Sequence, residues 1–399
     1  MNIEAIHKKS MQMQAKIIDN KDLLVMMLGK YESYETAKDE IARSISALGG
    51  ARDEFKYLTI PENQLRIATF FPLNLPLYSL VIFALVPGLF AERVVIRAPT
   101  TMQVIVNELF NLLDLQEVLP NIVIKNISRA TFLEVYAESS DIILFTGKYV
   151  NALDVKKRCP NSLLIFNGVG VNPVIVFSDA DTDLAAKKIV EMRTFNSGQD
   201  CAGTDVIFLH KSIAEEVTNK ISVQVEDIKV GQYGDPETQI GPILKKEYVE
   251  SLSNFIETME PYVVKMGFID YVTSTVSPYV ISRSIDSHHG EFHEFFAPVF
   301  YILTFERMEQ LVTILSQPDI EDFSMYISHF GTDPALETLK TSSQLLHGCI
   351  INDVEQGNKA YGGYGKKANF VSFGRKTISR PILISHEIDS FYKNNGIVD

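Results

Sequence analysis

The sequence predicts an α/β protein of two domains, and two observations carry this prediction. The chain has 399 residues, more than a single domain usually holds, and its 46% hydrophobic and 22% charged residues are an ordinary globular mixture. Short β-branched segments alternate with segments of helical apolar spacing, which is typical of parallel βαβ units. We therefore expect a first domain at 1–169, a second α/β domain at 170–360 and a C-terminal segment at 361–399.

In the first domain, apolar residues recur with helical spacing over 35–48, and Gly49-Gly50 is expected to end that helix. Residues 54–71 alternate around a Pro61-Glu62-Asn63 turn, which predicts a hairpin. Apolar stretches separated by helical runs such as 101–113 predict buried parallel strands at 93–96, 122–124, 142–145 and 163–166.

The second domain repeats this alternation. Strands are expected at 174–177 and 206–209 and around Tyr271 and Val280, with helices at 181–195, 245–259 and 308–315. The tail at 376–384 is extended and apolar, and Pro381 suits an edge strand. We expect this tail and the hairpin at 54–71 to form a small oligomerisation element that builds a homodimer or a higher homo-oligomer, because apolar edge strands tend to be paired.

Charge and composition exclude several classes of protein. A net charge of −13 argues against nucleic-acid binding, which relies on Lys and Arg neutralising phosphates. The apolar segment 70–90 contains Pro72, Pro76 and Pro87, so a strand, a turn and a buried helix are expected there rather than a membrane span. The first 22 residues carry polar and charged residues throughout, which is unlike a signal peptide.

Three cysteines, Cys159, Cys201 and Cys349, are too few and too scattered for a disulfide framework or a zinc site. We therefore expect a reducing, cytoplasmic compartment and no metal. Cys201 stands in the small, flexible sequence 195–203, Phe-Asn-Ser-Gly-Gln-Asp-Cys-Ala-Gly, which follows an expected helix. Taken alone, this thiol reads either as a small buried hydrophobe or as a nucleophile, and the neighbouring Asp200 would raise its pKa.

Five collinear segments favour the nucleophile. Residues 195–203 resemble the active-site signature of aldehyde dehydrogenases, in which a cysteine stands two residues after Gly-Gln, as Cys201 follows Gly198-Gln199. The other similar segments are 71–76, with Leu73 in place of Trp; 94–99; 145–147; and 294–299, with Ala297 in place of Gly. The resemblance runs from about residue 55 to the C-terminus and implies a Rossmann-like cofactor domain, an α/β catalytic domain and a small oligomerisation element.

The resemblance also implies roles for single residues. Cys201 would attack an aldehyde carbonyl, and the amide of Asn74 with the backbone N–H of Cys201 would stabilise the oxyanion. Alternatively, Asn74 is only a turn residue between two prolines, with no part in catalysis. The family's Glu-Leu-Gly-Gly glutamate, which activates the hydrolytic water, falls on Asn167, and an amide cannot accept that proton at neutral pH.

The implied cofactor is NAD or NADP. Glu294 would hold the nicotinamide ribose, Gly147 would allow a close backbone approach, and Lys148 follows it at the start of a helix. Arg97 replaces the family's lysine, and Thr100 stands where NAD-preferring members often carry glutamate, so a 2′-phosphate would be tolerated. Read separately, Arg97 is a surface cation, Gly147 a strand-to-helix turn and Glu294 a solvated acid.

The expected function is NAD(P)-dependent oxidation of a small-molecule aldehyde through a thioester on Cys201. Since Asn167 leaves hydrolysis without a base, the alternatives are acyl transfer to a thiol such as coenzyme A and reduction of an acyl-thioester to an aldehyde. A third alternative is a non-catalytic homologue that serves as a binding subunit, for which Asn167, Leu73, Asp200 and Ala297 speak. Retention of Cys201, Asn74 and Glu294 together speaks against it.

Overall fold

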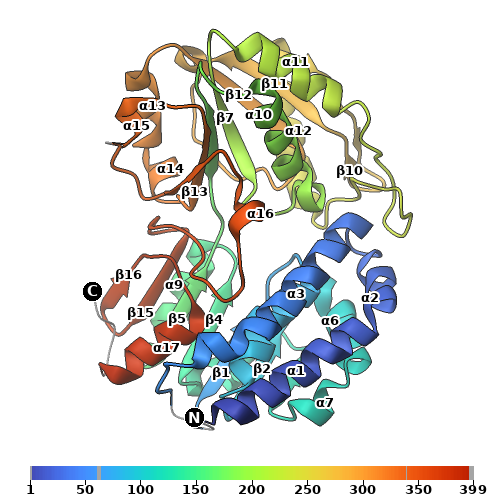
Figure 1. Ribbon diagram of the computed structural model, residues 1–399, viewed down its shortest axis with the longest axis vertical. Helices are drawn as coiled ribbons and strands as arrows, with labels where there is room; N and C mark the ends of the chain where they lie inside the picture. Colours follow the sequence, from blue (N-terminus) through green and yellow to red (C-terminus); the bar gives the residue numbers. More distant parts are fainter. Residues whose placement is uncertain (1, 61–63, 338, 395–399) are drawn as a thin grey trace.

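The computed structural model describes residues 2–60, 64–337 and 339–394, and it consists of two lobes, each built on a seven-stranded sheet (Figure 1). The first sheet has the order β16-β15-β5-β4-β1-β2-β3, and the second has the order β14-β13-β6-β7-β12-β11-β8. The expected α/β class is confirmed. Among the described residues, no helix combines the length and apolarity needed to cross a membrane.

Five parallel strands form the centre of the first lobe: β1 (Arg66–Phe70), β2 (Arg93–Arg97), β3 (Ile122–Ile124), β4 (Ile142–Thr146) and β5 (Leu163–Asn167). The antiparallel strands β15 (Asn369–Phe373) and β16 (Lys376–Ile378) extend the sheet beyond β5. One face packs under α1 (Ile3–Asp19), α2 (Lys21–Leu28), α3 (Tyr34–Phe55) and α6 (Gln103–Leu112), and the other packs under α8 (Arg129–Val135) and α9 (Tyr149–Arg158).

The second lobe holds β6 (Asn172–Val176), β7 (Thr204–His210), β11 (Tyr279–Ser284), β12 (Val299–Phe305), β13 (Tyr326–Phe330) and β14 (Gln344–His347), all parallel, with β8 (Val263–Lys265) antiparallel at the edge. Helices α10 (Thr182–Thr194) and α11 (Ala214–Gln224) cover one face, and α12 (Lys246–Met259) and α13 (Met308–Leu315) cover the other. The shorter elements are α7 (Leu115–Val118), β9 (Ile269–Asp270), β10 (Thr275–Val276), α14 (Pro318–Glu321), α15 (Pro334–Glu337) and α16 (Ile351–Val354), followed by α17 (Ile384–Lys393).

One buried helix follows β1 and carries the chain away from the sheet. It begins as α4 (Pro76–Leu80), passes through a π-helical turn at Val81–Leu85 and ends as α5 (Val86–Gly88). The Glu40 carboxylate of α3 caps its first turn, since Oε2 accepts hydrogen bonds from the backbone N–H groups of Leu77 at 3.1 Å and Tyr78 at 3.0 Å. In the π-helical turn, the carbonyl of Phe83 accepts a hydrogen bond from Thr69 Oγ1 of β1 at 3.0 Å.

Most expected strands and helices agree with the structure within two residues, and α13 has the predicted bounds. The strand expected in the tail at 376–384 is met only in part, because β16 ends at Ile378, Pro381 lies outside any strand and Ile384 begins α17. Two further expectations are wrong. Residues 54–71 form no hairpin, because 54–55 end α3 and β1 is a parallel strand between β2 and β4; the Pro61-Glu62-Asn63 turn lies outside the described residues. The helix does not end at Gly49-Gly50, because α3 is packed along its whole length and these glycines make room for the side chains of Gln14 and Asn358.

Candidate active site

A strained turn between α10 and β7 carries Cys201. Asn196, Ser197 and Gly198 all have left-handed backbone angles, with φ of 47°, 58° and 77°. A Cβ on Gly198 would lie 2.5 Å from the backbone carbon of Ala297, so only glycine fits there. The fully buried Arg193 holds the turn by donating to the Gly198 carbonyl at 2.7 Å and to the Asp205 carboxylate at 3.1 Å. Strain held in this way is typical of functional sites.

The Cys201 thiol lies in a protein environment that opposes its ionisation. Burial raises the pKa of the Cys201 thiol far above its usual range, and the neighbouring Asp200 carboxylate raises it further. The Tyr361 hydroxyl lies 3.4 Å from Sγ, and burial raises the pKa of Tyr361 too, so the phenol stays protonated and can donate to a thiolate. Asn172 fixes the backbone by donating to the Cys201 carbonyl at 3.0 Å.

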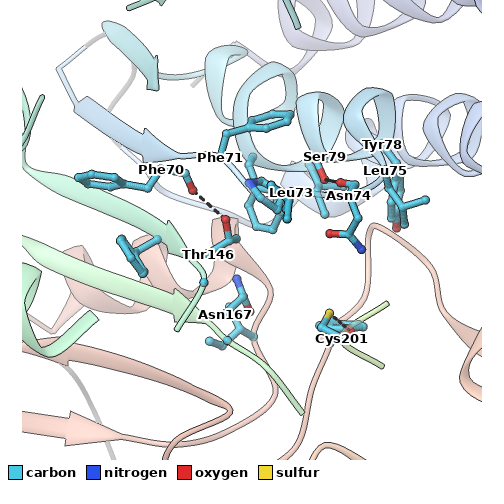
Figure 2. Close-up of a pocket in the computed structure, with 18 of the residues that line it drawn as sticks. Phe70, Phe71, Leu73, Asn74, Leu75, Tyr78, Ser79, Thr146, Asn167 and Cys201 are labelled. Atoms are coloured by element: carbon cyan, nitrogen blue, oxygen red, sulfur yellow. Dashed lines mark hydrogen bonds between the residues drawn. The ribbon is translucent and has the colours of Figure 1, made fainter. Parts of the chain in front are cut away.

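Asn74 faces Cys201 from the other lobe (Figure 2). Its side-chain Nδ2 donates to the Gln199 carbonyl at 3.2 Å, which ties the segment before α4 to the turn that bears the thiol. The next residue, Leu75, again has a left-handed φ, of 49°. The Asn74 amide and the Cys201 thiol therefore line one cavity at the boundary of the lobes, where an oxyanion donor and a nucleophile are needed together.

Asn167 lies at the end of β5, beside Thr146 in the register of the sheet, and lines the same cavity as Cys201 (Figure 2). Its backbone carbonyl accepts a hydrogen bond from Gly147 at 3.2 Å. Since the side chain is an amide, the position that the resemblance assigns to a general base holds no group that can take a proton from water.

Glu294 provides a buried carboxyl group with an unsatisfied oxygen. Its Oε1 has no hydrogen-bond partner among the described residues, and burial raises the pKa of Glu294 well above its usual range, with Asp205 adding to the shift. An orphaned buried acceptor is costly, about 1–3 kcal/mol, unless a ligand supplies a donor. Ribose hydroxyls are donors of this kind, so the position fits the expected ribose contact.

A second arginine accompanies Arg97 at the other end of the cavity. Arg97 Nε donates to the Ile127 carbonyl at 3.3 Å, and burial lowers the pKa of Arg97, with the nearby charge of Arg129 as the second cause. Arg129 donates through Nη2 to Asp154 at 2.9 Å, whereas its buried Nε has no hydrogen-bond partner within the described ranges. Two guanidinium groups of this kind suit a phosphate dianion. The cavity residues therefore fit a phosphorylated dinucleotide.

The cavity has a volume of about 390 Å³ and brings together seven of the eight expected site residues: Asn74, Arg97, Gly147, Lys148, Asn167, Cys201 and Glu294. Thr100 is exposed and lies outside this lining, next to Pro99, which belongs to it. The sequence reading missed Tyr361, Arg129, Asn172 and Arg193. A single tyrosine, asparagine or arginine carries no local pattern. Only the fold places Tyr361 and Arg129 in the cavity lining and lets Asn172 and Arg193 hold the backbone of the turn.

Comparisons with known proteins point to one family. The sequence profile described as the aldehyde dehydrogenase family matches residues 55–365. Rat alpha-aminoadipic semialdehyde dehydrogenase is 29% identical over 186 residues, which are 44% of this chain and 33% of that protein. Rat 4-trimethylaminobutyraldehyde dehydrogenase is 25% identical over 257 residues, 59% of this chain and 50% of that protein. The chain thus matches between a third and a half of the length of these relatives.

Solved structures share the fold. Glyceraldehyde-3-phosphate dehydrogenase GapN from Methanocaldococcus jannaschii, complexed with NADP, superposes with a TM-score of 0.78 at 19% identity, over 95% of this chain and 90% of that one. Betaine aldehyde dehydrogenase from Staphylococcus aureus gives a TM-score of 0.78 at 18% identity, over 96% and 83%.

The environment of Cys201 makes a testable prediction about its reactivity. Replacing Asp200→Asn removes the neighbouring anion while keeping an oxygen that can accept the Ala202 N–H, so the thiolate fraction should rise by roughly three- to tenfold. Alkylation of Cys201 by iodoacetamide at pH 8, followed by peptide mass spectrometry, should accelerate by the same factor, because the thiolate is the reactive form.

Cys349 serves as the internal control, since its alkylation rate should be the same in both proteins. In the unmodified protein the Cys201 rate should rise about tenfold per pH unit between pH 7 and 9, because its raised pKa lies above that range. A rate that does not change over this range would mean that the thiolate is already formed.

Proposed function

Because the chain belongs to the aldehyde dehydrogenase family, we propose that it is an NAD(P)-dependent oxidoreductase that oxidises an aldehyde through a thioester on Cys201. The observation that carries the proposal is one cavity lined by the thiol, by the facing amide of Asn74 and by the unsatisfied carboxyl oxygen of Glu294. A nucleophile, an oxyanion donor and an acceptor for ribose hydroxyls are the three groups that this reaction needs.

The residues divide the chemistry among them. The Cys201 thiol gives its proton to solvent, Sγ bonds to the aldehyde carbon, and the π electron pair of the carbonyl moves to its oxygen. Asn74 with the backbone N–H of Cys201 would stabilise that oxyanion, a contribution of about 3 kcal/mol for one such donor. Tyr361, 3.4 Å from Sγ, would donate to the sulfur while it is a thiolate, before bond formation moves the negative charge to the carbonyl oxygen. A bound nicotinamide supplies the chemistry of hydride acceptance, which converts the adduct on sulfur into a thioester. Glu294 would bind its ribose, and Arg97, Arg129 and Lys148 would face its phosphates.

Asn167 favours a second outcome for the thioester. With no carboxylate at this position, the general-base contribution of roughly 10²–10⁴-fold to hydrolysis is missing. The acyl group could then leave by transfer to a thiol such as coenzyme A, or the enzyme could run toward the aldehyde from an acyl-thioester. We place aldehyde oxidation first and acyl transfer or reduction second.

Rapid mixing with an aldehyde and NAD(P) tests the proposal. Hydride transfer should outrun release of the acid, so a burst of reduced cofactor approaching one per active site should precede a slow steady state. Cys201→Ala should abolish the burst, and Asn167→Glu should speed the slow phase while changing the burst rate little, because only deacylation needs the base. Faster turnover on adding coenzyme A would identify acyl transfer.

Activity that survives Cys201→Ala would refute the assignment of the nucleophile. Fast release of acid without a burst would instead mean that another residue supplies the base, and Glu294 is the first to test.

The arginine pair predicts the choice of dinucleotide. NADP should bind at least as tightly as NAD, because the 2′-phosphate can pair with both guanidinium groups. Arg129→Ala should weaken NADP binding by roughly tenfold and NAD binding much less. Calorimetric titration of both dinucleotides measures this, and Arg158→Ala at the far end of α9 is the matched control, with no expected effect. NADP binding more than about a hundredfold weaker than NAD binding would contradict this role for Arg97 and Arg129.

Assembly is the last part of the proposal. Among the residues that the structure describes, β16 ends the order of its sheet and pairs with β15, and strands at the edge of a sheet tend to be paired or covered. We expect at least a homodimer built through this C-terminal segment. Light scattering at micromolar concentration should give twice the mass of the chain or more, and a monomer with an intact tail would contradict the proposal.

A further inference from the structure

The buried helix after Asn74 has one side that faces a cavity rather than protein. Tyr78, Phe83 and Val86 retain 5–8% of their surface, whereas Leu80 and Leu85 on the same helix retain none. Tyr78, the half-buried Ile82 and Val86 recur every four residues, so they form a stripe on one side of the helix. A stripe of exposed surface on a helix that is otherwise buried means that an internal space runs along it.

This space belongs to the same cavity as Cys201. Beyond Asn74, its lining continues along the stripe to the end of the helix and is closed on the opposite side by the segment that leads into α17. We call this part of the cavity the apolar arm; its residues are Ile82, Phe83, Val86, Pro87, Phe90, Ile382, Leu383 and Ile384. From Ser79 to Pro87, near its end, the helix advances roughly 12 Å, which sets the length of the arm.

Most charged groups along the arm are bound to one another, and the exposed Lys359 also lines the cavity on this side. Glu355 accepts hydrogen bonds from the Tyr78 hydroxyl and from Arg43 Nη1, the latter at 2.8 Å, and Arg43 Nε pairs with Asp39 at 2.7 Å. Arg43 Nη2 has no hydrogen-bond partner in the part of the chain that the structure describes, but two carboxylates already balance the charge of this guanidinium.

At the far end, where Phe90 packs against Phe55 of α3, the Glu54 carboxylate accepts hydrogen bonds from Ser385 and Asn358. What the arm offers a ligand is therefore mainly hydrocarbon.

We propose that the apolar arm holds the hydrocarbon tail of the substrate, so that the enzyme acts on medium- to long-chain aliphatic aldehydes or the matching acyl-thioesters. This inference rests on the proposed function, because the carbonyl is taken to lie between Asn74 and Cys201. The tail then has one direction open to it, along the helix. Each methylene moved from water into such a cavity strengthens binding roughly fourfold, so chain length should determine affinity.

Two measurements test the arm. The value of kcat/KM should rise by about tenfold or more from propanal through hexanal to decanal. Without cofactor or reaction, 1-decanol should bind at least about tenfold more tightly than 1-butanol in calorimetric titrations. Ile82→Trp and Leu383→Trp narrow the arm from opposite walls and should each lower the decanal-to-propanal ratio and weaken 1-decanol binding. Ile18→Trp, on the exposed side of α1, is the matched control and should leave both unchanged.

The outcomes separate this inference from the proposed function. If propanal is oxidised with a burst, but kcat/KM does not depend on chain length and both alcohols bind equally, the role proposed for the apolar arm is wrong and the proposed function stands. Tight 1-decanol binding that both tryptophan variants remove, with no aldehyde oxidised, would support the arm and refute the function. A higher kcat/KM for succinic semialdehyde than for hexanal would contradict binding of a hydrocarbon tail in the apolar arm. It would indicate instead that Arg43 binds the carboxylate of the substrate.

Discussion

The close approach of Gly198 to Ala297 is the constraint on which the site depends. No side chain fits between these two backbones, and three consecutive left-handed residues are needed to bring them together. Such strain costs of order 1–3 kcal/mol per non-glycine residue and persists because the buried Arg193 holds the turn from beneath. One contact thereby fixes the turn that bears Cys201 and the segment that bears Glu294, two elements nearly a hundred residues apart.

Helix α3 connects this turn to the opposite side of the cavity. Its Thr36 hydroxyl accepts the Asn196 N–H at 3.2 Å, and its Glu40 carboxylate caps the helix that follows Asn74. Burial raises the pKa of Glu40 to about 7, and the buried Glu32 carboxyl beside it is shifted upward as well. Because the fold favours the protonated form of these carboxyl groups, their contribution to the free energy of unfolding is complete at low pH. It is lost as the pH rises through about 7, where Glu40 ionises in the folded protein. Alignment of the site is therefore obtained at a cost in stability.

The sequence predicts those parts of the fold that local pattern determines. Residues 122–124 and 142–145 are short apolar runs bounded by polar residues, and both are parallel strands. The run at 142–145 is fully buried in the middle of its sheet, where a continuous apolar strand is expected. The prediction at Gly49-Gly50 is wrong because a glycine that ends a helix and a glycine that allows close packing cannot be distinguished in the sequence. In the structure, the side chains of Gln14 and Asn358 occupy the space beside these glycines, so their role is close packing. Asn74 and Cys201 were found through the motifs around them, whereas Arg129 and the apolar arm arise from segments that meet only in the fold.

Under the proposed function, the missing base and the apolar arm have a common consequence. A thioester on the enzyme escapes hydrolysis only where no base activates water and little water is present. Asn167 removes the activation, and an alkyl chain that fills the arm would displace water from the space beside Cys201. The fate of the acyl group would then depend on which acceptor can approach from the cofactor side, between Lys148 and Glu294. In this arrangement the residues that form the thioester are retained. The acyl acceptor is then selected by the shape of the cavity, and no carboxylate at position 167 activates water for this step.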